Sequence, residues 1–287
     1  MISGRSSALG GKGRVRERFG KFILTLLAVF ISFAAVIPMF WVISDAFKDR
    51  GRVISDPLGL PDVWHWENFI TAWKQGHFGV YFINSILVVV PVVFFVLLFC
   101  VMAAYAFALM KFKFRNQLFV LFLAGLTIPL SVLIIPLFYE MLGLGLINTL
   151  WALILPQIAI SMPFGILLLH SFILEMPTEI LDAGRIDGCN RWQMLIYVVV
   201  PLSHPALLSL LIFEFMWTWN NFLLPVILVQ KDSSRTLPVG LNFFQGQYVT
   251  DVPLMMAAAT ITFLPVVIVY IIFQRQFIKG IAAGSLK

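Results

Sequence analysis

Charge is scarce in this chain of 287 residues, because Asp, Glu, Lys and Arg together make up only 12% of it. A soluble domain carries about twice that share. Hydrophobic residues make up 60% of the chain, 28 residues are Phe, and the mean hydropathy is +0.95. This composition excludes a soluble globular domain. It predicts an all-α, polytopic membrane protein.

Motifs that carry chemistry are missing as well. The sequence has no glycine loop that cradles phosphate, no His and Glu spacing typical of zinc and no nucleophile motif. The two cysteines, Cys100 and Cys189, fall inside an apolar stretch and in a polar segment respectively, so no disulfide framework is indicated. We therefore predict that the chain is not an enzyme and holds neither a metal nor a cofactor of its own.

Long stretches without charged residues make up most of the sequence. Each reaches the roughly 20 residues that a helix needs to cross the hydrocarbon core of a membrane. Turn residues between Gly143 and Thr149 divide the longest of them. Residues 192–213 would also pass as a span, but Pro201 and Pro205 favour a break there. The six predicted spans are 22–44, 82–109, 117–139, 149–172, 204–229 and 254–273.

The basic residues predict the orientation of these spans. Fourteen of the 20 Lys and Arg residues fall on the side that holds both ends of the chain. The positive-inside rule then predicts that the N-terminus and the C-terminus are both cytoplasmic. Residues 1–20 form a basic tail, 21–273 the membrane domain and 274–287 a second tail. The net charge of +6 follows from this arrangement, so we do not interpret it as a sign of nucleic-acid binding.

The segment 175–202 is a polar interlude between apolar runs. Five charged residues fall within thirteen positions, namely Glu179, Asp182, Arg185, Asp187 and Arg191. The pattern predicts two short helices joined at Gly188, where a positive φ costs a glycine little. An apolar stripe remains on each helix, formed by Ile180, Ala183 and Ile186 in the first and by Trp192, Leu195 and Ile196 in the second. Such a stripe is typical of a helix that inserts into a groove of a partner. We therefore predict a cytoplasmic helix-turn-helix that docks on another protein.

Polar residues recur within the fifth predicted span. Glu214, Thr218 and Asn221 are spaced i, i+4 and i+7, and Asn220 adjoins them, so the first three share one helix face. Polar groups at membrane depth avoid lipid. Two interpretations remain open: the face lines a polar pathway, or it holds helices together by hydrogen bonds.

A family resemblance rests on several of these stretches. The run from Leu181 to Gly188, with the prolines that follow, resembles the Glu-Ala-Ala loop of permease subunits in ATP-binding-cassette importers. The chain is similar, more narrowly, to carbohydrate-importer permeases related to the smaller membrane subunit of the maltose transporter. Other matching stretches are Tyr81 to Ser85, Ile128 to Leu137, Leu142 to Thr149, Trp219 to Pro225 and Gln274 to Lys287. Two departures are Asp182-Ala183-Gly184 in place of Glu-Ala-Ala, and Asn221 in place of an acidic residue.

The resemblance implies a subunit of a sugar or oligosaccharide importer in the bacterial cytoplasmic (inner) membrane. Its implied partners are a second permease subunit, a dimer of ATPase subunits that bind ATP and Mg, and an extracytoplasmic solute-binding protein. The residues expected to couple to the ATPase are Glu179, Asp182, Ala183, Arg185, Asp187 and Gly188. The candidate solute contacts are Glu214, Asn220 and Asn221. A permease for another small solute, and a self-sufficient channel or proton-coupled carrier, remain as alternatives.

Overall fold

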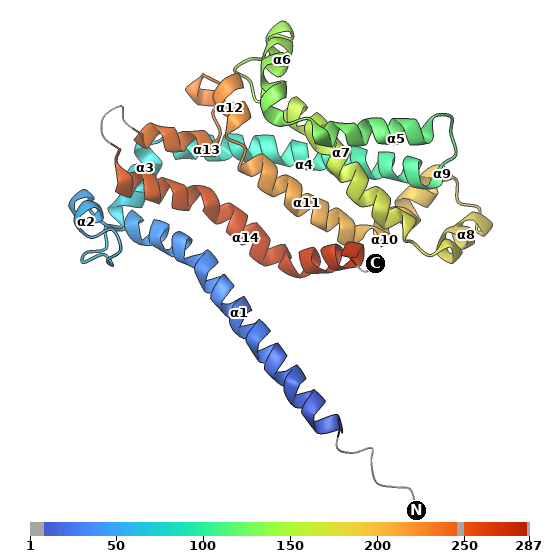
Figure 1. Ribbon diagram of the computed structural model, residues 1–287. Helices are drawn as coiled ribbons and strands as arrows, with labels where there is room; N and C mark the ends of the chain where they lie inside the picture. Colours follow the sequence, from blue (N-terminus) through green and yellow to red (C-terminus); the bar gives the residue numbers. More distant parts are fainter. Residues whose placement is uncertain (1–8, 246–249, 286–287) are drawn as a thin grey trace, which may run out of the picture.

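The structure is a computed structural model that describes residues 9–245 and 250–285. Most of the described residues are helical, and these residues contain one isolated bridge between Gln245 and Thr250 and no strand, so the all-α prediction is confirmed for them. The helices α4, α7, α11 and α14 lie side by side as a bundle (Figure 1). The helices are α1 Leu9–Ala46, α2 Arg50–Ser55, α3 Glu67–Gln75, α4 Phe78–Leu109, α5 Arg115–Ala124, α6 Leu130–Gly143, α7 Trp151–Leu174, α8 Thr178–Ile186, α9 Arg191–Gln193, α10 Val200–Leu202, α11 His204–Trp219, α12 Leu223–Leu228, α13 Leu237–Gly240 and α14 Val252–Ser285.

The described helices allow four to six membrane crossings. Four helices are long and apolar enough to cross a bilayer alone, and two pairs of shorter helices qualify if each bent pair is one span. The four are Gly20–Ala46 within α1, α4, α7 and Val252–Gln274 within α14; the pairs are Arg115–Thr127 with Leu130–Gly143, and Arg191–Leu202 with His204–Trp219.

The span predicted over 117–139 is not one straight helix. The chain bends by 101° between Thr127 and Leu130, where Ile128 and Pro129 adopt extended backbone with ψ of 112° and 140°. Proline lacks an amide hydrogen and disfavours the helical conformation in the residue before it. The break therefore follows from Pro129, and it directs α6 away from the bundle (Figure 1).

The helix predicted over 204–229 is also shorter than expected. The bend before it is present, because the chain turns by 75° at Ser203 between Pro201 and Pro205. The helix α11 then ends at Trp219, and Asn221 Oδ1 accepts a hydrogen bond from the amide of Leu224 at 3.2 Å, where α12 begins. An Asn side chain that bonds nearby backbone favours turns over helix interiors. The apolar run past Trp219 is thus a second, short helix.

The centre of the bundle is packed through a glycine. A Cβ atom on Gly165 of α7 would lie 2.5 Å from Sγ of Cys100 on α4 and 3.1 Å from Cδ2 of Leu210 on α11. Both neighbours are fully buried, and Cys100 Sγ also lies 3.6 Å from the carbonyl oxygen of Met162. Small residues let membrane helices approach closely. Gly165 is the position at which three helices meet.

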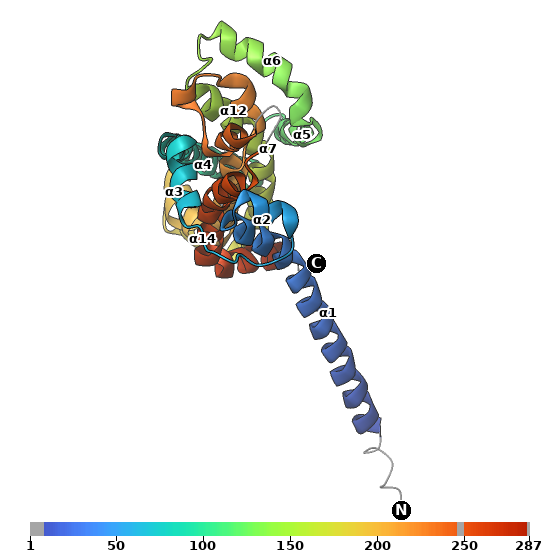
Figure 2. The ribbon, with the colours of Figure 1, turned by 90° about the vertical axis from the view of Figure 1, so that its left-hand side faces the viewer.

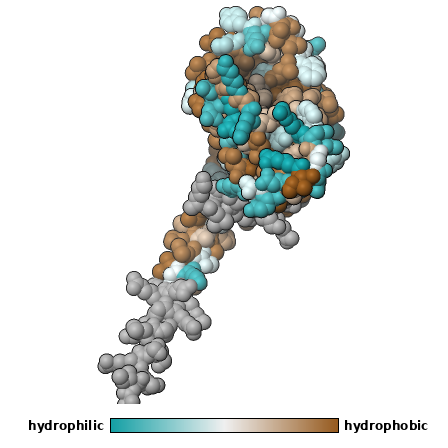
Figure 3. Space-filling model, turned by 90° about the vertical axis from the view of Figure 1, so that its right-hand side faces the viewer, coloured by the Kyte–Doolittle hydropathy of each residue, from teal (hydrophilic) through white to brown (hydrophobic). Residues whose placement is uncertain are grey.

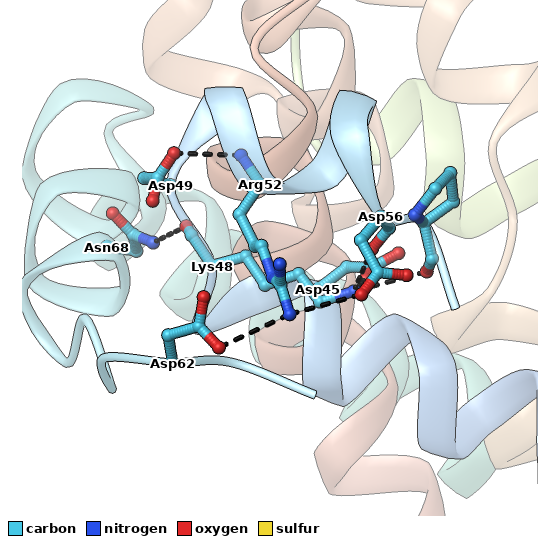
Figure 4. A network of polar contacts seen from close by, with 8 residues as sticks. Asp45, Lys48, Asp49, Arg52, Asp56, Asp62 and Asn68 are labelled. Atoms are coloured by element: carbon cyan, nitrogen blue, oxygen red, sulfur yellow. Dashed lines mark hydrogen bonds and ion pairs between the residues drawn. The ribbon is translucent and has the colours of Figure 1, made fainter. Parts of the chain in front are cut away.

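A polar network closes the end of the bundle that carries α2 and α3 (Figure 4). The side chain of Lys48 is fully buried and lies 2.7 Å from Asp45. Its Nζ also donates to the carbonyl oxygens of Asp56 and Pro57 at 3.3 and 3.1 Å, and Asn68 donates to the Lys48 carbonyl at 3.0 Å. Buried charge is stable only when it is paired and hydrogen-bonded, and here Lys48 is both. This end of α1 is therefore fixed.

Further contacts link the same end to α14. Arg52 lies 3.2 Å from Asp62, and Arg50 forms an ion pair with Asp251, one residue before α14. Asp49 caps α2 by accepting a hydrogen bond from the Arg52 amide at 2.9 Å, and that bond lowers the pKa of Asp49. The segment between α1 and α4, held together by these ion pairs and hydrogen bonds, thus forms one surface that we call the platform.

The first helix leaves the bundle. Figure 2 shows α1 projecting away from the other helices, and every residue from 21 to 40 is exposed. Its last turn is the exception, because Ala46 and the following Phe47 are buried beside α14 and α3. An apolar helix with so little contact needs lipid or another protein along its length.

Candidate functional site

The polar interlude folds as two helices around a glycine. The helix α8 ends at Ile186, Gly188 has φ of +81°, and the next helix begins at Arg191. Asn190 caps that helix, because its side chain accepts from the amides of Trp192 and Gln193 while Gln193 Oε1 accepts from the Asn190 amide. This reciprocal capping box fixes where the second helix starts.

The two helices pack through Gly184. A Cβ at this position would lie 2.9 Å from the terminal methyl carbon of Met194, which the π-helical segment Met194–Val199 presents. Leu181 is buried at the same contact. The glycine that departs from the Glu-Ala-Ala pattern is therefore a contact point, where the Met194 methyl fills the space that an alanine would take.

All six predicted coupling residues lie in α8 or the turn after it, and all six are exposed. Arg185 Nη1 lies 2.6 Å from Asp182 Oδ1, and these charges sit on the last and middle turns of α8. No added atom at Gly188 would meet another within 4 Å, so only its backbone conformation demands glycine. The structure thus groups these residues on one surface that the described residues leave uncovered.

An apolar face accompanies these charges, and we call Ile180, Ile186, Trp192 and Ile196 the docking face. Their exposed fractions are 42%, 86%, 61% and 53%. The predicted stripe differs at Leu195, which is 5% exposed and packs inward. Figure 3 shows this end of the molecule, where hydrophilic side chains gather next to apolar ones. Such a mixture is typical of a surface that a partner covers.

A second feature is a cavity of about 400 Å³ between α7, α11 and α12. Asn221 Nδ2 donates to Gln157 Oε1 at 3.2 Å across it. Its volume suits a small ligand, and its mixture of amide, hydroxyl and aromatic groups is typical of ligand sites. Its polar and aromatic lining residues are Gln157, Ser161, Trp217, Thr218, Asn221 and Phe222.

The three candidate solute contacts lie in three different places. Asn221 lines the cavity, whereas Asn220 is exposed and donates to the carbonyl of Met216 at 2.9 Å. Glu214 is fully buried, does not line the cavity, and has no hydrogen bond of ordinary geometry to either carboxyl oxygen among the described residues. Ser161, which does line the cavity, is close enough to interact with that carboxyl.

Sequence reasoning missed Gln157 and Ser161. Both lie on one face of α7 at spacing i, i+4, inside a stretch that is otherwise apolar, so the spacing was visible in the sequence. Among the described residues no group of three His, Cys, Asp or Glu side chains could hold a metal ion, and both cysteines are free.

Taken together, these features define a class: an all-helical, multi-pass membrane subunit that presents an exposed helical pair at one end of its bundle. The family described as "binding-protein-dependent transport system inner membrane component" matches residues 97–283. The chain belongs to this family.

Individual relatives are similar along nearly their whole length. The diacetylchitobiose uptake system permease protein NgcG of Streptomyces coelicolor is 35% identical over 273 residues, which cover 94% of this chain and 90% of that one. The arabinooligosaccharides transport system permease protein AraQ of Halalkalibacterium halodurans is 35% identical, covering 93% and 96%. A solved bacterial ABC transporter for alginate import shares the fold, with a TM-score of 0.76 at 20% identity over 96% and 99%.

Proposed function

We propose that this chain is one membrane subunit of an ATP-driven importer for a sugar or oligosaccharide. The observation that carries the proposal is the exposed pair of helices around Gly188, which combines a docking face with unshielded charges at one end of a membrane bundle. The relatives named above, which carry diacetylchitobiose or arabinooligosaccharides, support the substrate class. The chain itself is not an enzyme in this scheme.

The proposed topology has six crossings with both ends cytoplasmic. Each bent pair then counts as one span. The basic residues support this orientation, because the helical pair, the loop 110–115 and both tails carry most of the Lys and Arg residues. The positive-inside rule favours a cytoplasmic position for such segments. The platform around Lys48 lies on the other side, where a solute-binding protein would approach. One solved structure with the same fold is a bacterial alginate ABC transporter in complex with an alginate pentasaccharide-bound periplasmic protein.

The proposed mechanism is mechanical. A dimer of ATPase subunits binds ATP and Mg and closes, and the six coupling residues transmit this movement to α7 and α11, whose ends flank the helical pair. A second permease subunit completes the pathway and covers α1. Rocking of packed helices about a central site then exposes the cavity near Asn221 to one side or the other.

Capture of partners tests this proposal. We would purify the chain from gently solubilised membranes as wild type, Gly188→Trp and Gly145→Trp. Gly145 is the matched control, because it also has positive φ (+68°) and open surroundings but lies in the turn between α6 and α7. We expect wild type and Gly145→Trp to retain an ATPase and Gly188→Trp to lose it. Equal retention by all three, or uptake by the chain alone without ATP, would refute the proposal and favour a self-sufficient carrier.

The solute contact needs its own experiment. Asn221→Leu removes the amide that lines the cavity, whereas Asn220→Leu changes an adjacent, outward-facing amide. We expect only Asn221→Leu to raise the KM for uptake, by about tenfold, since a polar group left unpaired on a bound sugar costs about 1–3 kcal/mol. Equal effects of the two variants would remove the cavity from the solute pathway.

A further inference from the structure

A second cavity lies at the end of the bundle that carries α8 and α9, and we call it the basic hollow. Its volume is about 250 Å³, and it lies where the end of α4 meets the helical pair. Tyr105 and Leu109 line it from α4. Three cations from separate segments also line it: Lys111 after α4, Arg185 at the end of α8 and Arg191 at the start of α9.

The charged residues that line the hollow are all positive. None of its lining residues is acidic. Arg185 pairs with Asp182, but within the described ranges neither Lys111 nor Arg191 forms an ion pair. Cations that converge without a carboxylate favour an anion, and several donors around one cavity suit the oxygens of a phosphate.

The neighbouring loop points to a bilayer as the source of that anion. A further hollow of about 390 Å³ shares Lys111 and adds Arg115. Between these two cations lie Phe112 and Phe114, with exposed fractions of 40% and 57%, and Lys113 Nζ sits 4.9 Å from the Phe114 ring. Alternating cations and exposed aromatic rings at the end of a membrane helix are typical of a segment at headgroup depth.

We infer that the basic hollow binds the phosphate headgroup of an anionic phospholipid. Basic pockets between membrane helices on the cytoplasmic side have this property in general. The headgroup would meet Lys111, Arg185 and Arg191, and its acyl chains would lie beyond the exposed Phe112 and Phe114. Because the three cations come from separate segments, the lipid ties the end of α4 to the helical pair. The inference rests on the proposed cytoplasmic placement of this end.

The test uses the full chain in phosphatidylcholine nanodiscs with increasing phosphatidylglycerol, and it follows the thermal unfolding midpoint. A ligand that binds only the folded chain raises this midpoint. We expect the fraction of phosphatidylglycerol at half-maximal stabilisation to rise about fivefold for Lys111→Gln and for Arg191→Gln, the factor that matches ~1 kcal/mol for one cation near an anionic surface. Lys111→Arg keeps the charge and should restore the response.

Lys231→Gln is the matched control, because it removes an exposed cation at the opposite end of the bundle, near the start of α4. Its response should equal that of wild type. An unchanged midpoint with phosphatidylglycerol, equal responses of Lys111→Gln and Lys231→Gln, or the same stabilisation by inorganic phosphate in pure phosphatidylcholine would each overturn the inference. So would variants that keep the lipid response but lose ATPase retention, since the hollow would then accept a carboxylate of that partner. The ATPase is absent from the nanodiscs, so a negative lipid result leaves the importer proposal standing.

Discussion

The contact at Gly165 gives a prediction that two substitutions can decide. Gly165→Ala places a carbon 2.5 Å from Cys100 Sγ, where an ordinary nonbonded contact needs roughly 3.5–4.0 Å. The sulfur must therefore move by about 1 Å inside a closely packed region. Overpacking of this kind costs about 1–3 kcal/mol. We expect Gly165→Ala to unfold at a lower temperature than wild type.

Removing the sulfur should relieve most of this cost. In Cys100→Ala the nearest remaining atoms to a Cβ on residue 165 are Leu210 Cδ2 at 3.1 Å and the Cβ of residue 100 at 3.2 Å. These contacts are tight but need shifts of only a few tenths of an ångström. The double variant Gly165→Ala with Cys100→Ala should thus be more stable than the sum of its parts, with a coupling free energy of about 1–2 kcal/mol.

Thermal unfolding of the four proteins in nanodiscs measures this cycle. Gly143→Ala is the control for a bare glycine substitution, because nothing lies within 4 Å of its added Cβ. Gly165→Ala with the same effect in both backgrounds would refute the reasoning, since the Cys100 sulfur would then not be the atom it meets. An effect no larger than that of Gly143→Ala would refute the close packing itself.

Three other changes have definite expected outcomes. Lys48→Met should lower the free energy of unfolding by about 3–5 kcal/mol, because it leaves the Asp45 carboxylate without its partner. Adding Asp45→Asn to this variant should recover much of the loss. An unfolding midpoint equal to that of wild type would contradict the pairing. Glu214→Leu should raise thermal stability by about 1–3 kcal/mol, since neither oxygen of this buried carboxyl has a hydrogen bond of ordinary geometry among the described residues. A lower midpoint would show that the interaction with Ser161 is enough to stabilise the carboxyl. Gly188→Val should cost about 1–2 kcal/mol and weaken ATPase retention, whereas Gly188→Asn, which tolerates positive φ, should retain the ATPase; equal retention would refute the requirement for this backbone conformation.

Hydropathy and proline placement predicted most of the fold because both act locally. Apolar length marks the long helices, and Pro201 with Pro205 marks the bend at Ser203. The charge-free window predicts a span over 117–139, and the break at Pro129 within it follows from the same proline chemistry. In both cases the backbone chemistry of proline decided the outcome.

The candidate site was predictable where chemistry is local and not where it depends on packing. The turn at Gly188 and the exposed charges of α8 follow from residue type. The cavity does not, because it joins Gln157 of α7 to Asn221, which lies beyond the end of α11. Helical spacing predicts that Glu214 and Asn221 share one continuous face, but α11 ends at Trp219, before Asn221.

The position of α1 has a consequence for how the chain is made. The helix α1 is made before the helices of the bundle, and its end near Ala46 contacts α14 as well as the nearer platform around Lys48. Some two hundred residues must be synthesised and inserted before the contact with α14 can form, and the cost of closing so long a loop falls late in folding. Until then α1 is held by the bilayer and by its contacts with the nearby platform around Lys48. Truncation before α14 should therefore leave α1 inserted but without its contact to the bundle.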